Sequence, residues 1–233
     1  MLTKLFGFVN RHRWSVPLAV LSTAVFVHLA MEVREGELDV VDAAVAGAVT
    51  ELRGHVDYPM LALTYFGKGL CLAAVTTVAV LVMVVVHRRK EAIFLAACGI
   101  GTGLLNAGLK LAFHRARPDA TLDYLIESPA SFSFPSGHAM GSMGVLVSIV
   151  VALHVCRIPR PLWLFVTALV AVLVLGIGLS RIYFGVHYPS DVLAGQLAGA
   201  AWVSAMTGWF YPRLLPGEEA AEPAPVSSSG QTT

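Results

Sequence analysis

The chain has 233 residues, of which 56% are hydrophobic and 13% are charged, whereas soluble globular domains carry about 25% charged residues. This deficit predicts a membrane protein that crosses the bilayer several times and argues against a soluble enzyme. The formal net charge is +1 and the basic residues are scattered, so the composition gives no indication of nucleic acid binding.

Six apolar segments have the length of a membrane span. The first runs from Trp14 to about Val33; it exceeds the apolar region of a typical signal peptide and no cleavage site follows, so we expect a retained helix. The others cover about 60–86, 92–113, 138–156, 162–181 and 191–211, each near the ~20 residues that cross the hydrocarbon core. The prediction is an all-α, six-transmembrane-helix bundle forming a single domain over residues 1–215.

Two further segments differ from these spans. In residues 37–54, apolar positions recur every three or four residues, acids come first and Arg53 comes last, which predicts an amphipathic helix at the membrane surface. An ordinary surface helix packed on the loops is the alternative. Residues 216–233 are small, polar and proline-containing, which predicts a disordered cytoplasmic tail.

The distribution of basic residues predicts the orientation. Nine of the sixteen Lys and Arg residues lie in the N-terminal segment, in residues 87–90, at Arg157 and Arg160, and at Arg213. Span counting places all of these on one side, and basic residues are retained in the cytoplasm. We therefore expect both termini in the cytoplasm of a cell whose plasma or inner membrane holds the protein.

Three short polar blocks interrupt the apolar segments. They are KLAFHRARP at 110–118, PSGH at 135–138 and SRIYFGVHYPSD at 180–191. Counting spans places every block at the same, extracytoplasmic face of the membrane, where their side chains can meet.

The first two blocks have the chemistry of an oxyanion site. Lys110 and Arg117 are two helical turns apart and share one face if the helix continues, although Pro118 favours its end there. Ser136 and Gly137 precede an apolar helix, so an N-cap and unpaired backbone N–H groups face outward. A site of this kind binds anions.

In the third block, Pro189 separates His187 from Asp191. This spacing predicts that the carboxylate lies in the first turn of the last helix and reaches back to the imidazole. Such a carboxylate fixes the tautomer of the ring and leaves the other nitrogen able to attack a substrate.

Each of these residues taken alone has a structural interpretation, because single cations at membrane interfaces usually anchor a helix and single histidines often cap one. Seven of them on one face of a membrane protein favour a functional site. The structural interpretation is retained for Arg115, His114, Lys68, Asp119 and His154, and solvation explains Asp123 and Glu127 in the outer loop. The three cysteines, Cys71, Cys98 and Cys156, are interpreted as small buried hydrophobic residues.

The three blocks resemble the signature of the type 2 phosphatidic acid phosphatase family, in its membrane lipid phosphatase branch, which shares its site with vanadium haloperoxidases. The signature is K-x6-RP, PSGH and SR-x5-H-x3-D, and this chain matches it without departure at Lys110 to Arg117-Pro118, at 135–138 and at Ser180-Arg181 to His187 to Asp191. The blocks span about 80 residues, and the helix layout extends the resemblance to most of the chain.

The resemblance implies a phosphatase site that requires neither metal nor cofactor. His187 would be the nucleophile that forms a phosphohistidine, Asp191 would orient it, and His138 would protonate the leaving lipid oxygen. The phosphoryl oxygens would be held by Lys110, Arg117, Ser136, Gly137 and Arg181.

The expected function is hydrolysis of a lipid phosphate monoester or pyrophosphate, of the phosphatidylglycerol phosphate, phosphatidic acid or undecaprenyl pyrophosphate type. A haloperoxidase is disfavoured by the spans. A phosphotransferase that uses a lipid pyrophosphate, and a non-hydrolytic transporter of lipid phosphates, remain alternatives. The sequence gives no indication of oligomeric state.

Overall fold

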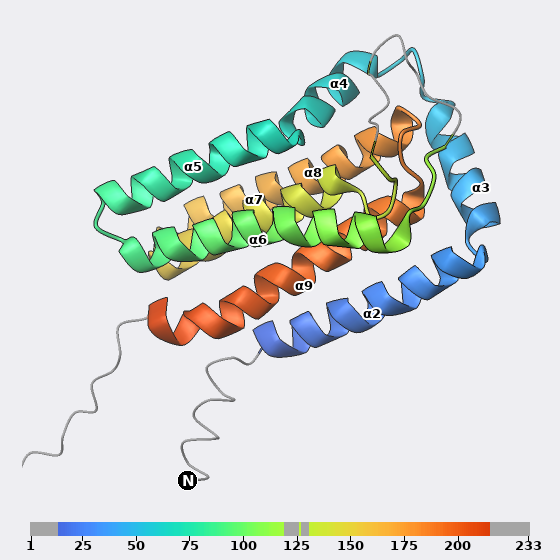
Figure 1. The fold of residues 1–233 in the computed structure, drawn as a ribbon. Helices are drawn as coiled ribbons and strands as arrows, with labels where there is room; N and C mark the ends of the chain where they lie inside the picture. The colour runs from blue at the N-terminus through green and yellow to red at the C-terminus, as the bar shows by residue number, and fades with distance from the viewer. Residues whose placement is uncertain (1–13, 119–125, 127–130, 215–233) are drawn as a thin grey trace, which may run out of the picture.

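The computed structural model describes residues 14–118, 126 and 131–214, with side chains up to residue 210. In these residues it contains helices and no strand (Figure 1), which confirms the all-α prediction. The helices are α2 (Ser15–Glu35), α3 (Asp39–Thr50), α4 (Asp57–Phe66), α5 (Gly69–Val85), α6 (Arg89–Phe113), α7 (Gly137–Val155), α8 (Arg160–Tyr183) and α9 (Pro189–Leu214). The predicted tail 216–233 lies outside the described residues, as do Asp119, Asp123 and Glu127.

The protein is an integral, multi-pass membrane protein. Within the described residues, α2, α6, α7 and α8 are long and apolar enough to cross a membrane, and α4 with α5 makes a fifth span if the bent pair counts as one. Large aliphatic side chains such as Val20, Leu81, Ile100 and Val172 are exposed on these helices. Contiguous apolar surface of this kind marks contact with lipid.

The predicted number of six spans is not confirmed by this criterion. The predicted segment 191–211 corresponds to α9, which has 26 residues but is not among the helices apolar enough to count. The physical reason is its position, because α9 packs along both α2 and α7 and buries Ala194, Ala198 and Val203. A helix enclosed by other helices does not need the composition of one that faces lipid.

The predicted continuous span 60–86 is wrong in one respect, since it breaks between α4 and α5 with a bend of 54°. Gly67 lies at the break, and a Cβ atom there would be 2.5 Å from Ile177 and 2.8 Å from His138. Glycine therefore permits the chain to approach α7 and α8 closely at this point. Lys68, the next residue, is exposed and places its ammonium group 3.8 Å from the centre of the Tyr65 ring.

The arrangement of the helix ends positions the three polar blocks. The C-terminal ends of α6 and α8 and the N-terminal ends of α7 and α9 lie at one end of the bundle, beside α3 and α4 (Figure 1). The first turn of α2 and the last turn of α9 lie at the opposite end. All three blocks therefore share one end of the molecule, as span counting predicts.

Candidate active site

His187 lies at the centre of the polar end of the bundle and is almost fully buried. Its Nδ1 is 3.4 Å from Asp191 Oδ2 and 3.3 Å from Ser133 Oγ, and its Nε2 is 3.1 Å from Arg117 Nη1. A guanidinium nitrogen can only donate, so Nε2 accepts and the ring proton is assigned to Nδ1. The lone pair of Nε2 therefore faces the cations of the site.

A tight connection between α8 and α9 sets this geometry. The chain turns at Gly185, whose φ of 68° lies in the left-handed region that favours glycine. Pro189 begins α9, so Asp191 falls in its first turn, where its Oδ2 accepts a hydrogen bond of 2.9 Å from the backbone N–H of Tyr188. The side chain is thereby aimed back toward the imidazole.

Asp191 is fully buried and its two oxygens have different partners. Oδ1 accepts a hydrogen bond of 2.8 Å from Arg115 Nη1. Oδ2 accepts from the hydroxyl of Ser133 as well as from Tyr188. One oxygen is thus tied to a cation and the other faces His187.

The first block supplies two cations by a route that differs from the prediction. The helix does not continue to Arg117, because α6 ends at Phe113 and His114 caps it with a left-handed φ of 48°. Lys110, on the last turn, donates to the carbonyl oxygen of Phe132. Arg117, on the loop that follows, donates to Ser131 O at 2.8 Å and to Val186 O at 2.7 Å. The loop, not a shared helix face, brings them together.

Three predicted site residues have buried polar atoms without a hydrogen-bond partner among the described residues: Ser136 Oγ, His138 Nε2 and Arg181 Nε. An unsatisfied buried polar group costs about 1–3 kcal/mol, and a polar ligand bound here could pair with these three atoms. His138 also lies within electrostatic range of Arg181 and His187. The other arm of Arg181 donates to Thr64 Oγ1.

The start of α7 is held against the start of α9. The backbone N–H of Ser136 donates to Asp191 O at 2.9 Å. A Cβ atom at Gly137 would lie 3.0 Å from Asn106 Oδ1, so glycine leaves room beside the first amides of the helix. This helix end and the third block are therefore one unit.

Electrostatics keep His187 neutral at physiological pH. Burial lowers the pKa of the imidazole to about 4; the hydrogen bond and charge of Asp191 raise it, and Arg117 and Arg181 lower it further. Burial likewise lowers the pKa of Arg117 from its ordinary value. A neutral imidazole with an unprotonated Nε2 is the form that can act as a nucleophile.

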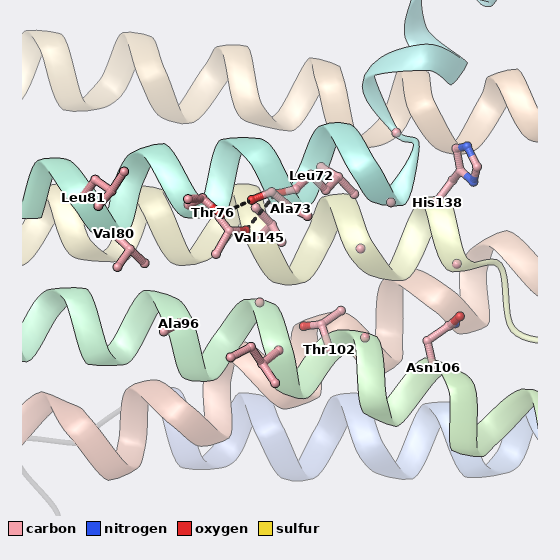
Figure 2. Close-up of a pocket in the computed structure, with 18 residues that line it drawn as sticks. Leu72, Ala73, Thr76, Val80, Leu81, Ala96, Thr102, Asn106, His138 and Val145 are labelled. Atoms are coloured by element: carbon pink, nitrogen blue, oxygen red, sulfur yellow. Dashed lines mark hydrogen bonds between the residues drawn. The ribbon is translucent and has the colours of Figure 1, made fainter.

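A cavity of about 620 Å³ leads away from the site between α5, α6 and α7. Figure 2 shows His138 and Asn106 at one end of it and Val80 and Leu81 at the other. Small and aliphatic side chains make up most of its lining, and it follows the membrane-spanning part of the helices. We call this cavity the apolar groove.

Several residues of the site were not predicted. Arg115 was interpreted as structural, yet it binds Asp191; Ser133 contacts both His187 and Asp191. Thr64 accepts a hydrogen bond from Arg181 and Asp42 accepts one from Arg115, and both lie in segments for which the sequence predicted no catalytic or binding role. Only Arg115 and Ser133 carried a signal, since each lies two or three residues from a motif residue.

The fold and the site define a membrane-embedded helical protein with the chemistry to hold an oxyanion at one end of an apolar groove. Residues 91–214, more than half of the chain, match the model of the PAP2 superfamily, and the chain belongs to that superfamily.

Relatives and a solved structure agree with this assignment. A lipid A 1-phosphatase of Rhizobium johnstonii is 38% identical over 119 residues, 48% of this chain and 44% of that protein. An undecaprenyl-diphosphatase of Sulfolobus acidocaldarius is 31% identical over 153 residues, 64% of this chain and 67% of that protein. The chain thus spans less than half of the first relative and two thirds of the second. The crystal structure of a transmembrane PAP2 type phosphatidylglycerolphosphate phosphatase from Bacillus subtilis has a TM-score of 0.75 and 27% identity, covering 82% of this chain and 94% of that chain.

Proposed function

We propose that the protein is an integral membrane lipid phosphatase that hydrolyses the phosphate monoester or pyrophosphate of a lipid. One observation carries the proposal: the cluster around His187 and His138 lies at the end of the apolar groove. A phosphate in the cluster and a hydrocarbon tail in the groove would belong to one amphiphilic molecule. The names of the relatives refer to lipid A, undecaprenyl diphosphate and phosphatidylglycerolphosphate. Each of these molecules is a lipid that carries phosphate.

In the proposed reaction, Nε2 of His187 attacks phosphorus and forms an N–P bond while the P–O bond to the lipid breaks. His138 gives a proton to the leaving oxygen, and Asp191 stabilises the charged imidazole through Nδ1. In a second step water attacks phosphorus and the N–P bond to His187 breaks, which returns the electron pair to Nε2. His138 takes up the proton that the water loses, and inorganic phosphate leaves.

The phosphoryl oxygens are assigned to Lys110, Arg117 and Arg181, with the hydroxyl of Ser136 and the amide of Gly137. A phosphate monoester carries about −1.5 to −2 charges near neutral pH, and three cations with a helix N-terminus compensate this charge and that of the transition state. The orphaned atoms of Ser136 and Arg181 support the assignment. By the basic-residue bias, the site is extracytoplasmic and both termini are cytoplasmic.

Phosphate release by the purified protein tests the proposal. The substrates are phosphatidic acid, phosphatidylglycerol phosphate, undecaprenyl pyrophosphate and a short, water-soluble phosphate monoester. We expect release from at least one long-tailed lipid, inhibition by vanadate, and no release by a folded His187→Ala variant. Binding of lipid phosphate with no release by the wild-type protein would favour the transporter alternative instead.

A pair of glycine variants tests the groove. Gly103 lines it and Gly108 does not, and a Cβ atom at either would have no neighbour within 4 Å. We expect Gly103→Phe to raise KM for the long-tailed lipid several-fold and to leave the short monoester unaffected. Gly108→Phe is the control and should match the wild type on both substrates.

A further inference from the structure

Helix α3 sends one carboxylate into the polar end of the bundle. Asp42 is 2% exposed, although its neighbours Val40 and Val41 are 80% and 54% exposed. Its Oδ1 accepts from the backbone N–H of Ser190 at 2.8 Å and its Oδ2 from the Ser190 hydroxyl at 2.6 Å. The sequence places Asp42 among the acids at the start of this helix, and that pattern gave no indication that its carboxylate is buried.

Arg115 joins this carboxylate to Asp191. Its Nη2 lies 2.9 Å from Asp42 Oδ2 and its Nη1 lies 2.8 Å from Asp191 Oδ1. The Ser190 hydroxyl accepts a further hydrogen bond of 2.8 Å from Nη1, and the guanidinium carbon lies 4.1 Å from the centre of the Tyr188 ring. A planar guanidinium held by two carboxylates and a ring face has one orientation.

This pair continues into the candidate active site. The oxygen of Asp191 that does not bind Arg115 is the one that faces His187 Nδ1. The three contacts form a series from α3 through the 114–118 loop and the start of α9 to the imidazole. In the described residues, neither Asp42 nor Arg115 forms a hydrogen bond or ion pair with His187.

We propose that Asp42 and Arg115 are positioning residues for His187, which act through Asp191, so that helix α3 supports the reacting group rather than only lying at the membrane surface. The inference rests on the proposed function in taking His187 as the nucleophile. Asp42 fixes Arg115 and partly neutralises it, Arg115 fixes Asp191, and Asp191 orients the imidazole.

The proposal predicts opposite electrostatic effects for the two partners. The charged or titratable groups around His187 are Asp191 of α9, Arg117 and Arg115 of the loop, Arg181 of α8, Lys110 of α6 and His138 of α7, with Asp42 and Asp39 of α3 facing Arg115. Removing the charge of Asp42 leaves Arg115 less compensated and disfavours the imidazolium. Removing the charge of Arg115 favours it.

Two variants of the full chain that each remove one charge test this. Asp42→Asn should lower kcat by about tenfold to 100-fold with little change in KM. It should also lower the titration midpoint of His187 by about half a unit or more. Arg115→Gln should lower kcat too, but raise that midpoint. The midpoint is followed by NMR of histidine-labelled protein, with the His187 signal assigned from its absence in His187→Ala.

The control is Glu51→Gln, which removes the same charge at the other end of the same helix. Glu51 is exposed and is the C-cap residue of α3, whereas Asp42 lies in its first turn, so kcat and the midpoint should stay at their wild-type values. Equal midpoints in wild type, Asp42→Asn and Arg115→Gln would overturn the inference, even if kcat falls, because loosened packing alone would then explain the loss. If one variant does not fold, the His187 midpoint of the other still tests the inference: a shift in the expected direction supports it, and no shift or the opposite shift contradicts it.

The NMR midpoint needs no turnover, so the two proposals fail separately. A wild-type protein that releases phosphate from no lipid contradicts the proposed function. Unshifted midpoints contradict the positioning role whether or not phosphate is released.

Discussion

At the scale of single residues, the environment of His187 decides the chemistry available to it. The ring lies between a carboxylate on one nitrogen and a guanidinium group on the other. The carboxylate orients the ring and the guanidinium disfavours its protonation. The result is an imidazole that stays neutral under physiological conditions while it is surrounded by groups that attract a phosphate.

This environment predicts the acidic side of the pH profile. The attacking form is neutral, so kcat/KM should rise with pH through the pKa of His187, which burial lowers to about 4, and should already be level near the ordinary histidine value of about 6.5. The measurement is kcat/KM for phosphate release from about pH 3.5 to about pH 9, a range that includes both pKa values. An acidic limb centred at 6.5 or above, and thus above the second ionisation of the substrate phosphate at about 6, would contradict the assignment of His187 as the neutral nucleophile in this environment.

The motif residues could be predicted because each belongs to a short sequence pattern from which the local geometry can be inferred. Their supporting residues could not, since they come from distant segments: Ser190 and Asp42 are 148 residues apart, and Arg181 and Thr64 are 117 apart. A hydrogen bond of this kind leaves no periodicity in either segment. Only the packing of the helices brings the two residues of each pair together.

At the scale of helices, small residues bring α7 and α9 together at the site. A Cβ atom at Gly195 would lie 2.6 Å from Ser136 O, and one at Gly199 would lie 2.8 Å from Met140 O. Glycines four residues apart are a known means of close helix contact in membranes. Here the contact also holds the Ser136 amide against the carbonyl oxygen of Asp191.

Adding one methyl group at this contact should therefore damage both stability and activity. Gly195→Ala forces α9 away from a backbone oxygen that cannot rotate aside, and we expect a cost of about 1–3 kcal/mol with a lower kcat. Gly108→Ala is the matched control, because its Cβ atom meets nothing within 4 Å and alanine is the better helix former. Thermal unfolding in detergent and phosphate release check both variants. A Gly195→Ala protein as stable and active as the control would show that this contact does not hold the site.

The apolar segments were correctly predicted to be helices, but the positions at which the helices break or end were not all predicted. The apolar run 60–86 gave no sign of the break at Gly67, because a glycine next to a lysine is compatible with a continuous span. The end of α6 at Phe113 matches the predicted span end at residue 113, whereas the expectation that Pro118 ends the helix at Arg117 is not met. Both differences depend on contacts with other helices, which a single-sequence pattern does not contain.

At the scale of the whole molecule, the bundle has a polar end and a groove that opens from it. The helix ends of the three blocks meet beside α3 and α4, and the turn between α5 and α6 lies at the other end (Figure 1). Which end faces the cytoplasm rests on the basic residues, and residues 87–90 contribute three of them. This orientation determines which leaflet supplies the lipid.

Cysteine labelling in intact cells tests the orientation. The background is a variant with Cys71, Cys98 and Cys156 replaced by alanine, into which Glu37→Cys or Lys90→Cys is introduced. Both positions are exposed; Glu37 lies in the turn between α2 and α3 and Lys90 in the first turn of α6. These two segments lie at opposite ends of the bundle (Figure 1). If the polar end is extracytoplasmic, a membrane-impermeant maleimide labels Glu37→Cys in intact cells and Lys90→Cys only after lysis. Retained phosphate release shows that each variant is folded. Labelling of Lys90→Cys in intact cells, with Glu37→Cys protected until lysis, would reverse the orientation and assign the lipid to the cytoplasmic leaflet.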